Sequence, residues 1–121
     1  DYRPAEVAEE KIKKSDAESG RAIELEPTQD ILAWLGRHRR DGQFLCGFAM
    51  ETENLLANAS AKLEKKNVDM ICANSLRAAG AGFAVDTNIL TLITKDGINE
   101  LPIMSKEEAA DAILDEIAKQ L

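Results

Sequence analysis

The sequence predicts an α/β protein in which a parallel β-sheet is flanked by helices. Hydrophobic residues make up 45% of the chain and aromatic residues only 4%, which is typical of Val/Ile/Leu strands packed against Ala/Leu helices. Apolar runs of strand length also alternate with amphipathic helical patterns, and this is the order of a βαβ crossover. With 121 residues, the chain has the length of about one domain.

The N-terminal quarter carries the weakest patterns. Residues 1–21 have no consistent apolar period and are expected to form a loop. Residues 22–26 alternate apolar and polar side chains, which predicts a short strand with one solvated face. Thr28 can then cap a helix over residues 29–40. Its expected buried stripe consists of three aliphatic residues, Ile31, Leu32 and Leu35.

The middle of the chain predicts two buried strands joined by a helix. Residues 43–49 are a short apolar run, as in a strand covered on both faces. Thr52 is expected to cap a helix that ends near Lys66, and residues 68–73 form the second buried strand. A loop is expected over residues 74–82, which are rich in Ala and Gly. The apolar positions of the helix are Leu55, Leu56, Ala59 and Leu63.

A hairpin and a final helix complete the predicted fold. Residues 87–95 favour a strand, and Asp96-Gly97 is a good hairpin turn into a strand near residues 99–103. Ser105 and Glu108 have the spacing of a capping box, which starts the last helix. The expected buried face of that helix is Ala110, Ile113, Leu114, Ile117 and Leu121.

The charge of the chain limits its partners. A net charge of −7 argues against general nucleic-acid binding, which needs a basic face. The basic residues are nevertheless clustered in KIKK at 11–14, RHRR at 37–40 and KLEKK at 62–66, so a small phosphate ligand remains compatible. The sequence has no signal peptide and no apolar run of membrane-spanning length, so we expect a soluble cytoplasmic protein without a membrane partner.

Cysteine and histidine give little support for catalysis. Cys46 and Cys72 each lie in a predicted buried strand without CxxC or Cys/His spacing. We interpret them as small core residues, and a catalytic or redox role is the less favoured alternative. His38 is the single histidine, so it has no partner of its kind for a metal site, and it lies in RHRR near an expected helix end, where positive charge suits the helix dipole and a solvated terminus is the favoured interpretation.

Two groups of lysines could bind an anion. Lys11, Lys13 and Lys14 repel one another, so a site among them would favour an anionic ligand. Lys62 and Lys66 are spaced to share one helix face and could both reach one polyphosphate. An ammonium group suits a phosphate or a developing oxyanion. The spacing alone nevertheless favours a solvated charge run in both cases.

Four other features are weak signals by themselves. The turn from Pro27 to Leu32 frees backbone N–H groups at a helix start, as every helix N-terminus does. Phe48 follows Gly47 near a strand end, where it could line a ligand crevice or simply belong to the core. Asp1 could accept hydrogen bonds from the amino group of a base or be a loop aspartate. Asn74 could contact a ligand, although a role in a turn is favoured.

These signals occur together in a fixed order. The motifs are DYRP at 1–4, KIKK at 11–14, PTQDIL at 27–32, GFAMET at 47–52, KLEKKNVDMICAN at 62–74, GFAVDTNILTLI at 82–93 and SKEEAADAILDEI at 105–117. In this order the chain resembles, essentially end to end, the C-terminal half of bacterial phosphopantothenoylcysteine synthetase. The combination of DYRP with KIKK, and of GFAMET with the two lysines and DMICAN, carries the resemblance.

The resemblance implies an activity in coenzyme A biosynthesis. Members of this family join 4′-phosphopantothenate to cysteine, and the bacterial members use CTP with Mg²⁺. The carboxylate attacks the α-phosphate to give an acyl-cytidylate and pyrophosphate, and the cysteine amine then displaces CMP. The family is dimeric, and the 22–26 strand and the 87–103 hairpin are candidate edges for pairing between subunits.

The resemblance also assigns roles by position. Asp1 would contact the cytidine, and Lys11 would bind nucleotide and support the acyl-cytidylate step as the catalytic residue. Lys13 and Lys14 would belong to a flap that closes over the ligand. The metal ligands stay unknown. The remaining CTP-binding positions are Gln29, Asp30, Ile31, Leu32, Phe48, Lys62 and Lys66. The family often has Pro at the position of Gln29 and Ala at that of Met50; the second difference is expected to affect packing.

The implied fold is a Rossmann-like sheet that is incomplete at its N-terminal half, with a small antiparallel β extension. No strand with a glycine-rich phosphate turn opens the chain. Residues 1–121 then form the C-terminal part of the ligase domain, with a nucleotide-site loop and flap at 1–21 and the α/β core at 22–121. We expect these residues alone to be inactive. FMN would take part only if the parent protein has an upstream decarboxylase domain.

Two alternatives remain. The chain could be a non-catalytic α/β dimerisation or interaction module in which the lysines are solvated. It could also belong to an ATP-using ligase of the eukaryotic kind, although the DYRP and KIKK pattern favours the bacterial kind.

Overall fold

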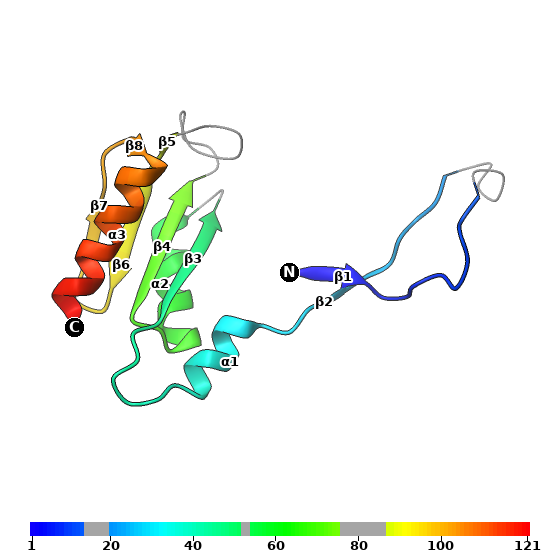
Figure 1. The fold of residues 1–121 in the computed structure, drawn as a ribbon, viewed down its shortest axis with the longest axis horizontal. Helices are drawn as coiled ribbons and strands as arrows, with labels where there is room; N and C mark the ends of the chain where they lie inside the picture. Colours follow the sequence, from blue (N-terminus) through cyan, green and yellow to red (C-terminus); the bar gives the residue numbers. More distant parts are fainter. Residues whose placement is uncertain (14–19, 52–53, 76–86) are drawn as a thin grey trace. The chain divides into compact units, whose positions relative to one another are not determined.

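The computed structural model describes residues 1–13, 20–51, 54–75 and 87–121 (Figure 1). The chain divides into two compact units, Asp1–Ile31 and Leu32–Leu121, which we treat separately. Lys14, Thr52 and most of the predicted 74–82 loop lie outside the described residues. Among the described helices, none has both the length and the apolar character needed to cross a membrane.

The first unit is built on a two-stranded antiparallel ladder. Strand β1 (Tyr2–Pro4) pairs with β2 (Leu25–Pro27), and Arg3 forms an ion pair of 2.6 Å with Glu26. Strand β1 therefore falls inside the predicted loop, and β2 starts later than the predicted 22–26 strand. Three residues are too few to show an apolar period, so pairing between distant segments defines both strands.

A mixed four-stranded sheet forms the centre of the second unit. The strands are β3 (Cys46–Glu51), β4 (Met70–Ser75), β6 (Leu90–Thr94) and β7 (Ile98–Glu100), in the order β3-β4-β6-β7. Strands β3 and β4 are parallel and the other two pairs are antiparallel. Helix α2 (Leu55–Lys66) connects the parallel pair, so the predicted βαβ unit and the α/β class are confirmed.

The hairpin region differs in detail from the prediction. The turn at Asp96-Gly97 joins β6 to β7 as predicted. The predicted strand over residues 87–95 is instead two strands, because β5 (Thr87–Asn88) leaves the main sheet and pairs with β8 (Met104–Ser105). The change of partner at Ile89 is a long-range effect that alternation alone does not reveal.

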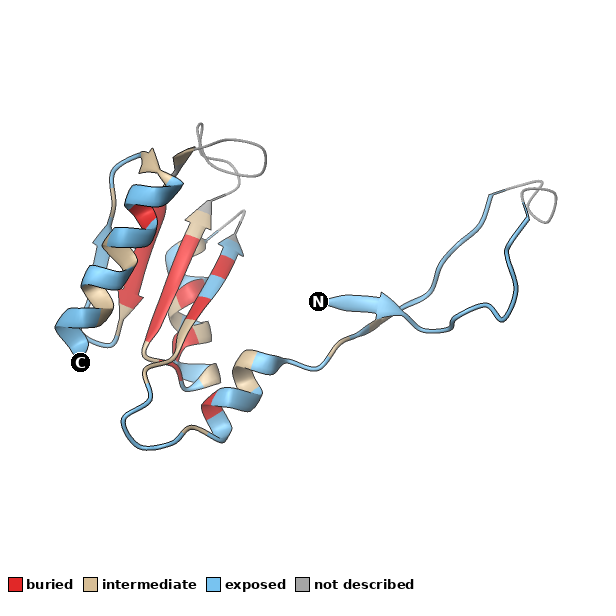
Figure 2. Cartoon of the chain, viewed as in Figure 1, coloured by how far each residue is buried: buried red, intermediate tan, exposed pale blue. Residues whose placement is uncertain are grey.

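Each face of the sheet packs against helices (Figure 2). One face packs against α2 and α1 (Ile31–Arg37), and the other against α3 (Lys106–Gln120). The first cluster contains Ala49, Ala59, Leu63, Val68, Ile71, Ala73 and Ile93. The second contains Met70, Cys72 and Leu92, with Phe44, Cys46, Leu101, Ile113 and Ile117 packed against it. Strand β4 is therefore covered on both faces, as predicted.

Strand β3 is an edge strand, which corrects the prediction of a strand covered on both faces. Gly47 and Ala49 point to the α2 side and are buried, whereas Phe48 and Met50 point to the opposite face and are exposed. Within the described residues β3 is the outermost strand of the sheet, and the cluster under α3 is centred on β4 and β6, so the outward side chains of β3 stay exposed.

The predicted buried stripes of the helices are partly wrong. In α1, Leu32 packs against the core, whereas Ile31 and Leu35 are exposed. In α2, Ala59 and Leu63 are buried as predicted and Leu56 is exposed.

The capping box of Ser105 and Glu108 at the start of α3 is confirmed. The helix buries a narrower face than predicted. Ala109 is buried, and Ile113 and Ile117 pack on the sheet at i, i+4 spacing, because the helix contacts one sheet face only. The other three predicted positions are exposed: Ala110, Leu114 and Leu121.

Candidate functional site

The most distinctive side chain on the sheet is Phe48. Its neighbours Gly47 and Ala49 are buried, but Phe48 itself is 69% exposed. Strands β3 and β4 run parallel, so their carboxyl ends, where α/β sheets usually bind ligands, lie at one edge. The sequence predicted Phe48 as a ligand contact, and its exposed ring is free to make an apolar or stacking contact.

Leu32 lies on the opposite face of the same strand. A Cβ atom built on Gly47 would meet Leu32 Cδ2 at 2.4 Å and Ile71 Cδ1 at 3.1 Å. Leu32 therefore occupies the space that a side chain at position 47 would need. Gly47 thus leaves room for Leu32 of α1 on one face of the sheet, and Phe48 places an aromatic ring on the other face.

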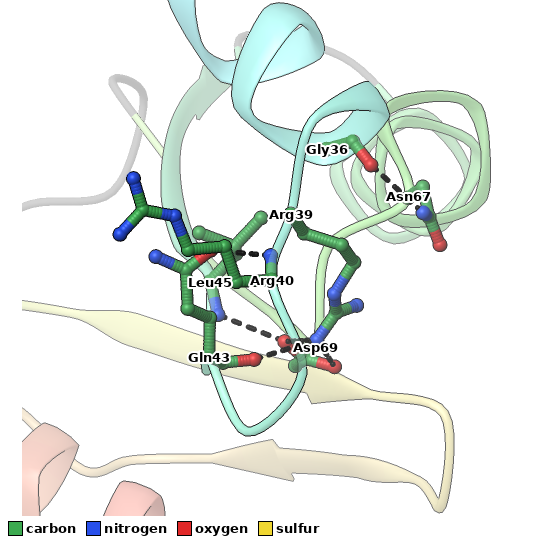
Figure 3. A network of polar contacts seen from close by, with 7 residues as sticks. All are labelled: Gly36, Arg39, Arg40, Gln43, Leu45, Asn67 and Asp69. Carbon is green, nitrogen blue, oxygen red and sulfur yellow. Dashed lines mark hydrogen bonds and ion pairs between the residues drawn. The ribbon is translucent and has the colours of Figure 1, made fainter.

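Lys62 and Lys66 lie one turn apart in the last two turns of α2, and both are partly buried. The backbone of Lys66 contacts α1 closely, because a Cβ built on Gly36 would lie 1.7 Å from Lys66 O. Asn67, the αL cap of α2, donates from Nδ2 to Gly36 O at 2.9 Å (Figure 3). The structure therefore brings the ends of α1 and α2 together.

The predicted residues of the second unit are thus divided between two faces. Leu32, Lys62 and Lys66 belong to the helices that cover one face. Phe48 points to the other face, because it is paired in register with Cys72, whose side chain lies in the α3 cluster. The two faces meet at the outer edge of β3, which is unpaired within the described sheet.

A polar network fixes the loop between α1 and β3 (Figure 3). The Asp69 carboxylate accepts from Arg39 Nη2 at 2.8 and 3.1 Å and from the Leu45 amide at 2.8 Å. Arg39 also donates to Gln43 O at 2.7 Å. The Arg39 and Asp69 side chains are only 27% and 23% exposed, so solvent weakens their ion pair less than that of a surface pair.

This network sets where β3 begins relative to β4. Sequence reasoning placed Arg39 at a solvated helix end and gave Asp69 no role. A signal was present, however, because Asp69 lies between Val68 and Met70 in a predicted buried strand, and a charge there requires a partner.

In the first unit, β-pairing brings Asp1 to the predicted helix start. The Asp1 carbonyl accepts from the Thr28 amide at 2.9 Å, immediately before Gln29 and Asp30. Gln29, Asp30 and Ile31 are all exposed. Lys11 and Lys13 are exposed in the segment after β1 and belong to the same unit.

A dedicated metal cage is not found in residues 1–13, 20–51, 54–75 and 87–121, where no three His, Cys, Asp or Glu side chains converge.

Comparison with known proteins places the chain in a family. Residues 1–121 match the family model described as DNA/pantothenate metabolism flavoprotein C-terminal domain. The Bacillus subtilis (strain 168) coenzyme A biosynthesis bifunctional protein CoaBC is 48% identical over 119 residues, which are 98% of this chain and 29% of that protein. The Vibrio cholerae protein of the same name is 43% identical over all 121 residues, 30% of its length.

Solved structures agree with this assignment. The crystal structure of the C-terminal domain of CoaBC superposes with a TM-score of 0.72 at 41% identity, covering 99% of this chain and 49% of that one. The Streptococcus pneumoniae DNA/pantothenate metabolism flavoprotein has a TM-score of 0.70 at 23% identity, covering 92% of this chain and 46% of that one, and supports the fold alone. The chain belongs to the DNA/pantothenate metabolism flavoprotein C-terminal domain family, which confirms the resemblance drawn from its motifs.

Proposed function

We propose that this chain supplies part of the CTP site of a phosphopantothenate–cysteine ligase in coenzyme A biosynthesis. The observation that carries the proposal is the family match over residues 1–121, together with relatives named as coenzyme A biosynthesis proteins. The chain spans about 30% of the length of those relatives. The complete reaction is therefore proposed for the whole polypeptide that carries this sequence.

In this proposal Phe48 contacts the nucleotide through its exposed ring. Exposing an aromatic ring to water on the face of a sheet is unfavourable unless a ligand or partner covers it. The flat face of a nucleotide base is a suitable surface to stack on such a ring. Lys62 and Lys66 supply positive charge on one helix face. Gln29, Asp30, Ile31 and Leu32 form the helix start that receives the nucleotide.

Further roles of the proposal belong to residues of the first unit. Asp1, held beside Thr28 by its backbone, accepts hydrogen bonds from the cytosine amino group. Lys11 stabilises the charge that develops around the α-phosphate when the substrate carboxylate attacks it. Lys13 and Lys14 belong to a flap that excludes water from the acyl-cytidylate.

Mg²⁺ fits this proposal as a companion of the triphosphate. Mg²⁺ is usually bound through substrate phosphates and one or two carboxylates, not by a cage of protein groups alone. When bound, it would supply positive charge that offsets the negative charge of the triphosphate. FMN belongs to the proposal only through a decarboxylase domain elsewhere in a bifunctional parent.

A homodimer is the second part of the proposal. No described residue of the first unit is buried, although it carries several exposed apolar side chains. These are Tyr2, Val7, Ile12, Ile23 and Leu25. Apolar side chains of this number are expected to need a covering surface. This observation also favours the alternative function, a non-catalytic dimerisation module.

Calorimetry separates the two functions. CTP with Mg²⁺ is titrated into the wild type and into Phe48→Ala, with Ile98→Ala as the control because Ile98 is also exposed but lies on β7. Loss of one base–aromatic contact of about 1–3 kcal/mol weakens binding roughly 5- to 150-fold. Equal affinity in all three proteins would favour the non-catalytic module.

The same titration tests the lysines and the base. Lys62→Ala is compared with Lys65→Ala, since Lys65 is exposed on the same helix and has no proposed role. Only Lys62→Ala is expected to weaken CTP binding. Tighter binding of ATP than of CTP would instead support an ATP-using ligase.

A further inference from the structure

Two cysteines that are distant in sequence meet on one face of the sheet. Cys46 lies on β3 and Cys72 on β4, and their sulfur atoms are 3.5 Å apart. The strand register pairs Cys46 with Met70 and Phe48 with Cys72, so both thiols point to the face that α3 covers. A separation of 26 residues hides this pair from any search for CxxC spacing.

The two thiols differ in access. Cys72 is 0% exposed, because β4 is covered on both faces. Cys46 is partly exposed, since it lies on the edge strand β3. A reagent from solvent therefore reaches Cys46 first, and Cys72 is held directly behind it.

The two thiols also differ in acidity. The hydrogen bond with Cys72 holds the pKa of Cys46 below its ordinary value, although burial works in the opposite direction. The same hydrogen bond and burial raise the pKa of Cys72. Either sulfur can donate the hydrogen bond that joins the two thiols. Since the thiolate is the nucleophile, the lower pKa of Cys46 agrees with its greater access in making it the attacking thiol.

We propose that Cys46 and Cys72 form a redox-active dithiol that low-molecular-weight disulfides convert into a bond between β3 and β4. The Cys46 thiolate attacks one sulfur of the disulfide RS–SR, a Cys46–SR bond forms, and RS⁻ leaves. Cys72 gives its proton to solvent and attacks Cys46 Sγ, so the Cys46–Cys72 bond forms and the second RS⁻ leaves. Two protein thiols are oxidised while one small disulfide is reduced to two thiols.

The geometry favours the second step over accumulation of the mixed disulfide. The resolving sulfur already lies 3.5 Å from Cys46 Sγ, and a disulfide needs about 2.05 Å. Cys46 is in register with Met70, so the two cysteines are diagonal neighbours, and the bond requires a local shift of the edge strand β3 as well as rotation of the side chains. The surrounding apolar cluster includes Phe44 and Ile113, which are only partly buried. The Cys46–Cys72 disulfide would link β3 covalently to β4, and Cys46 lies two residues before Phe48. This inference does not depend on the proposed CTP site.

The test uses glutathione disulfide as the oxidant, followed by alkylation of the remaining thiols and tryptic mapping. Trypsin separates the two cysteines, because Lys62, Lys65 and Lys66 lie between them. In the wild type, we expect the peptides of Cys46 and Cys72 to be joined by a disulfide and to separate after reduction. Recovery of both cysteines in the thiol form, or of a lasting mixed disulfide at Cys46, would overturn the proposal.

Two variants identify the order of events. Cys72→Ser is expected to stop at a glutathione adduct on Cys46, whereas Cys46→Ser is expected to leave Cys72 unmodified or to react at least tenfold more slowly. Adduct formation on Cys72 in Cys46→Ser at the wild-type rate would overturn the assignment of Cys46 as the attacking thiol. Cys72→Ala replaces Cys72→Ser if circular dichroism shows that the buried hydroxyl prevents folding.

Discussion

The close approach of α1 to α2 gives a sharp prediction, because two physical effects of opposite sign meet at Gly36. Replacing Gly36 by Ala inside a helix should stabilise it by about 1 kcal/mol through propensity. The new Cβ, however, would lie 1.7 Å from Lys66 O, 2.9 Å from Lys66 C and 3.2 Å from Asn67 O. All three atoms belong to the backbone, so no rotation of a side chain can relieve the overlap.

The steric effect should win. Overpacking a well-packed site costs about 1–3 kcal/mol and occasionally more. Here α1 has to move away from α2, which also weakens the hydrogen bond from Asn67 Nδ2 to Gly36 O and the packing of Leu32 on Gly47. We expect a net loss of about 2–3 kcal/mol in the free energy of unfolding, which lowers Tm by roughly 8–20 °C for a domain of this size.

Urea unfolding followed by circular dichroism measures this loss. Gly97→Ala is the matched control, because a Cβ at Gly97 meets nothing within 4 Å. The control should stay within about 0.5 kcal/mol of the wild type. A Gly36→Ala variant as stable as the wild type, or more stable, would show that helix propensity dominates and that the two helices are not in contact.

The remaining predictions concern other contacts of the second unit. Asp69→Asn should cost about 2 kcal/mol in urea unfolding, because it leaves Arg39 without its carboxylate, while Asp41→Asn, in the exposed loop between α1 and β3, should cost almost nothing; equal losses would contradict a role for the network. Gly47→Ala should cost about 1–2 kcal/mol, less than Gly36→Ala, because the nearest obstacle is a leucine methyl group that can rotate; a larger loss in the same assay would contradict this order. The capping-box hydrogen bonds lower the pKa of Glu108 below 4.5, so its contribution to stability is present above the unfolded pKa and is lost as pH falls through the folded pKa. Glu108→Gln should therefore flatten the fall of stability below about pH 4.5 in acid titrations followed by circular dichroism, and an unchanged acid limb would refute this.

The parts of the fold that local patterns determine were predicted from the sequence. Strand β4 was recognised because Met70 to Ala73 form an uninterrupted apolar run, and all four are buried. The start of α3 was recognised because Ser105 and Glu108 have capping-box spacing. In both cases the residues that decide the structure are neighbours along the chain.

The parts that distant segments determine were missed. The stripe of α1 was misjudged because Gly36, and not Leu35, faces α2, and a glycine gives no hydrophobic signal. The partners Arg39 and Asp69 come from different elements, as do Cys46 and Cys72. No local pattern reports such pairs.

The same contrast between local patterns and contacts of distant segments applies to the candidate site. Phe48 and the lysine pair on α2 were predicted from motif order, and the structure adds that Phe48 is exposed and that Lys66 adjoins α1. Their division between two sheet faces depends on strand register, which the sequence does not report. The roles of Asp1 and Lys11 remain predictions.

Isotope transfer in the complete polypeptide that carries this sequence tests the central proposal most directly. 4′-Phosphopantothenate labelled with ¹⁸O in its carboxylate is supplied with cysteine, CTP and Mg²⁺, and the mass of the nucleotide product is measured. Attack of the carboxylate on the α-phosphate predicts CMP that carries one ¹⁸O atom, and a Lys11→Ala variant should form it far more slowly than Lys95→Ala. Unlabelled CMP, or ligation that requires ATP in place of CTP, would contradict the proposal.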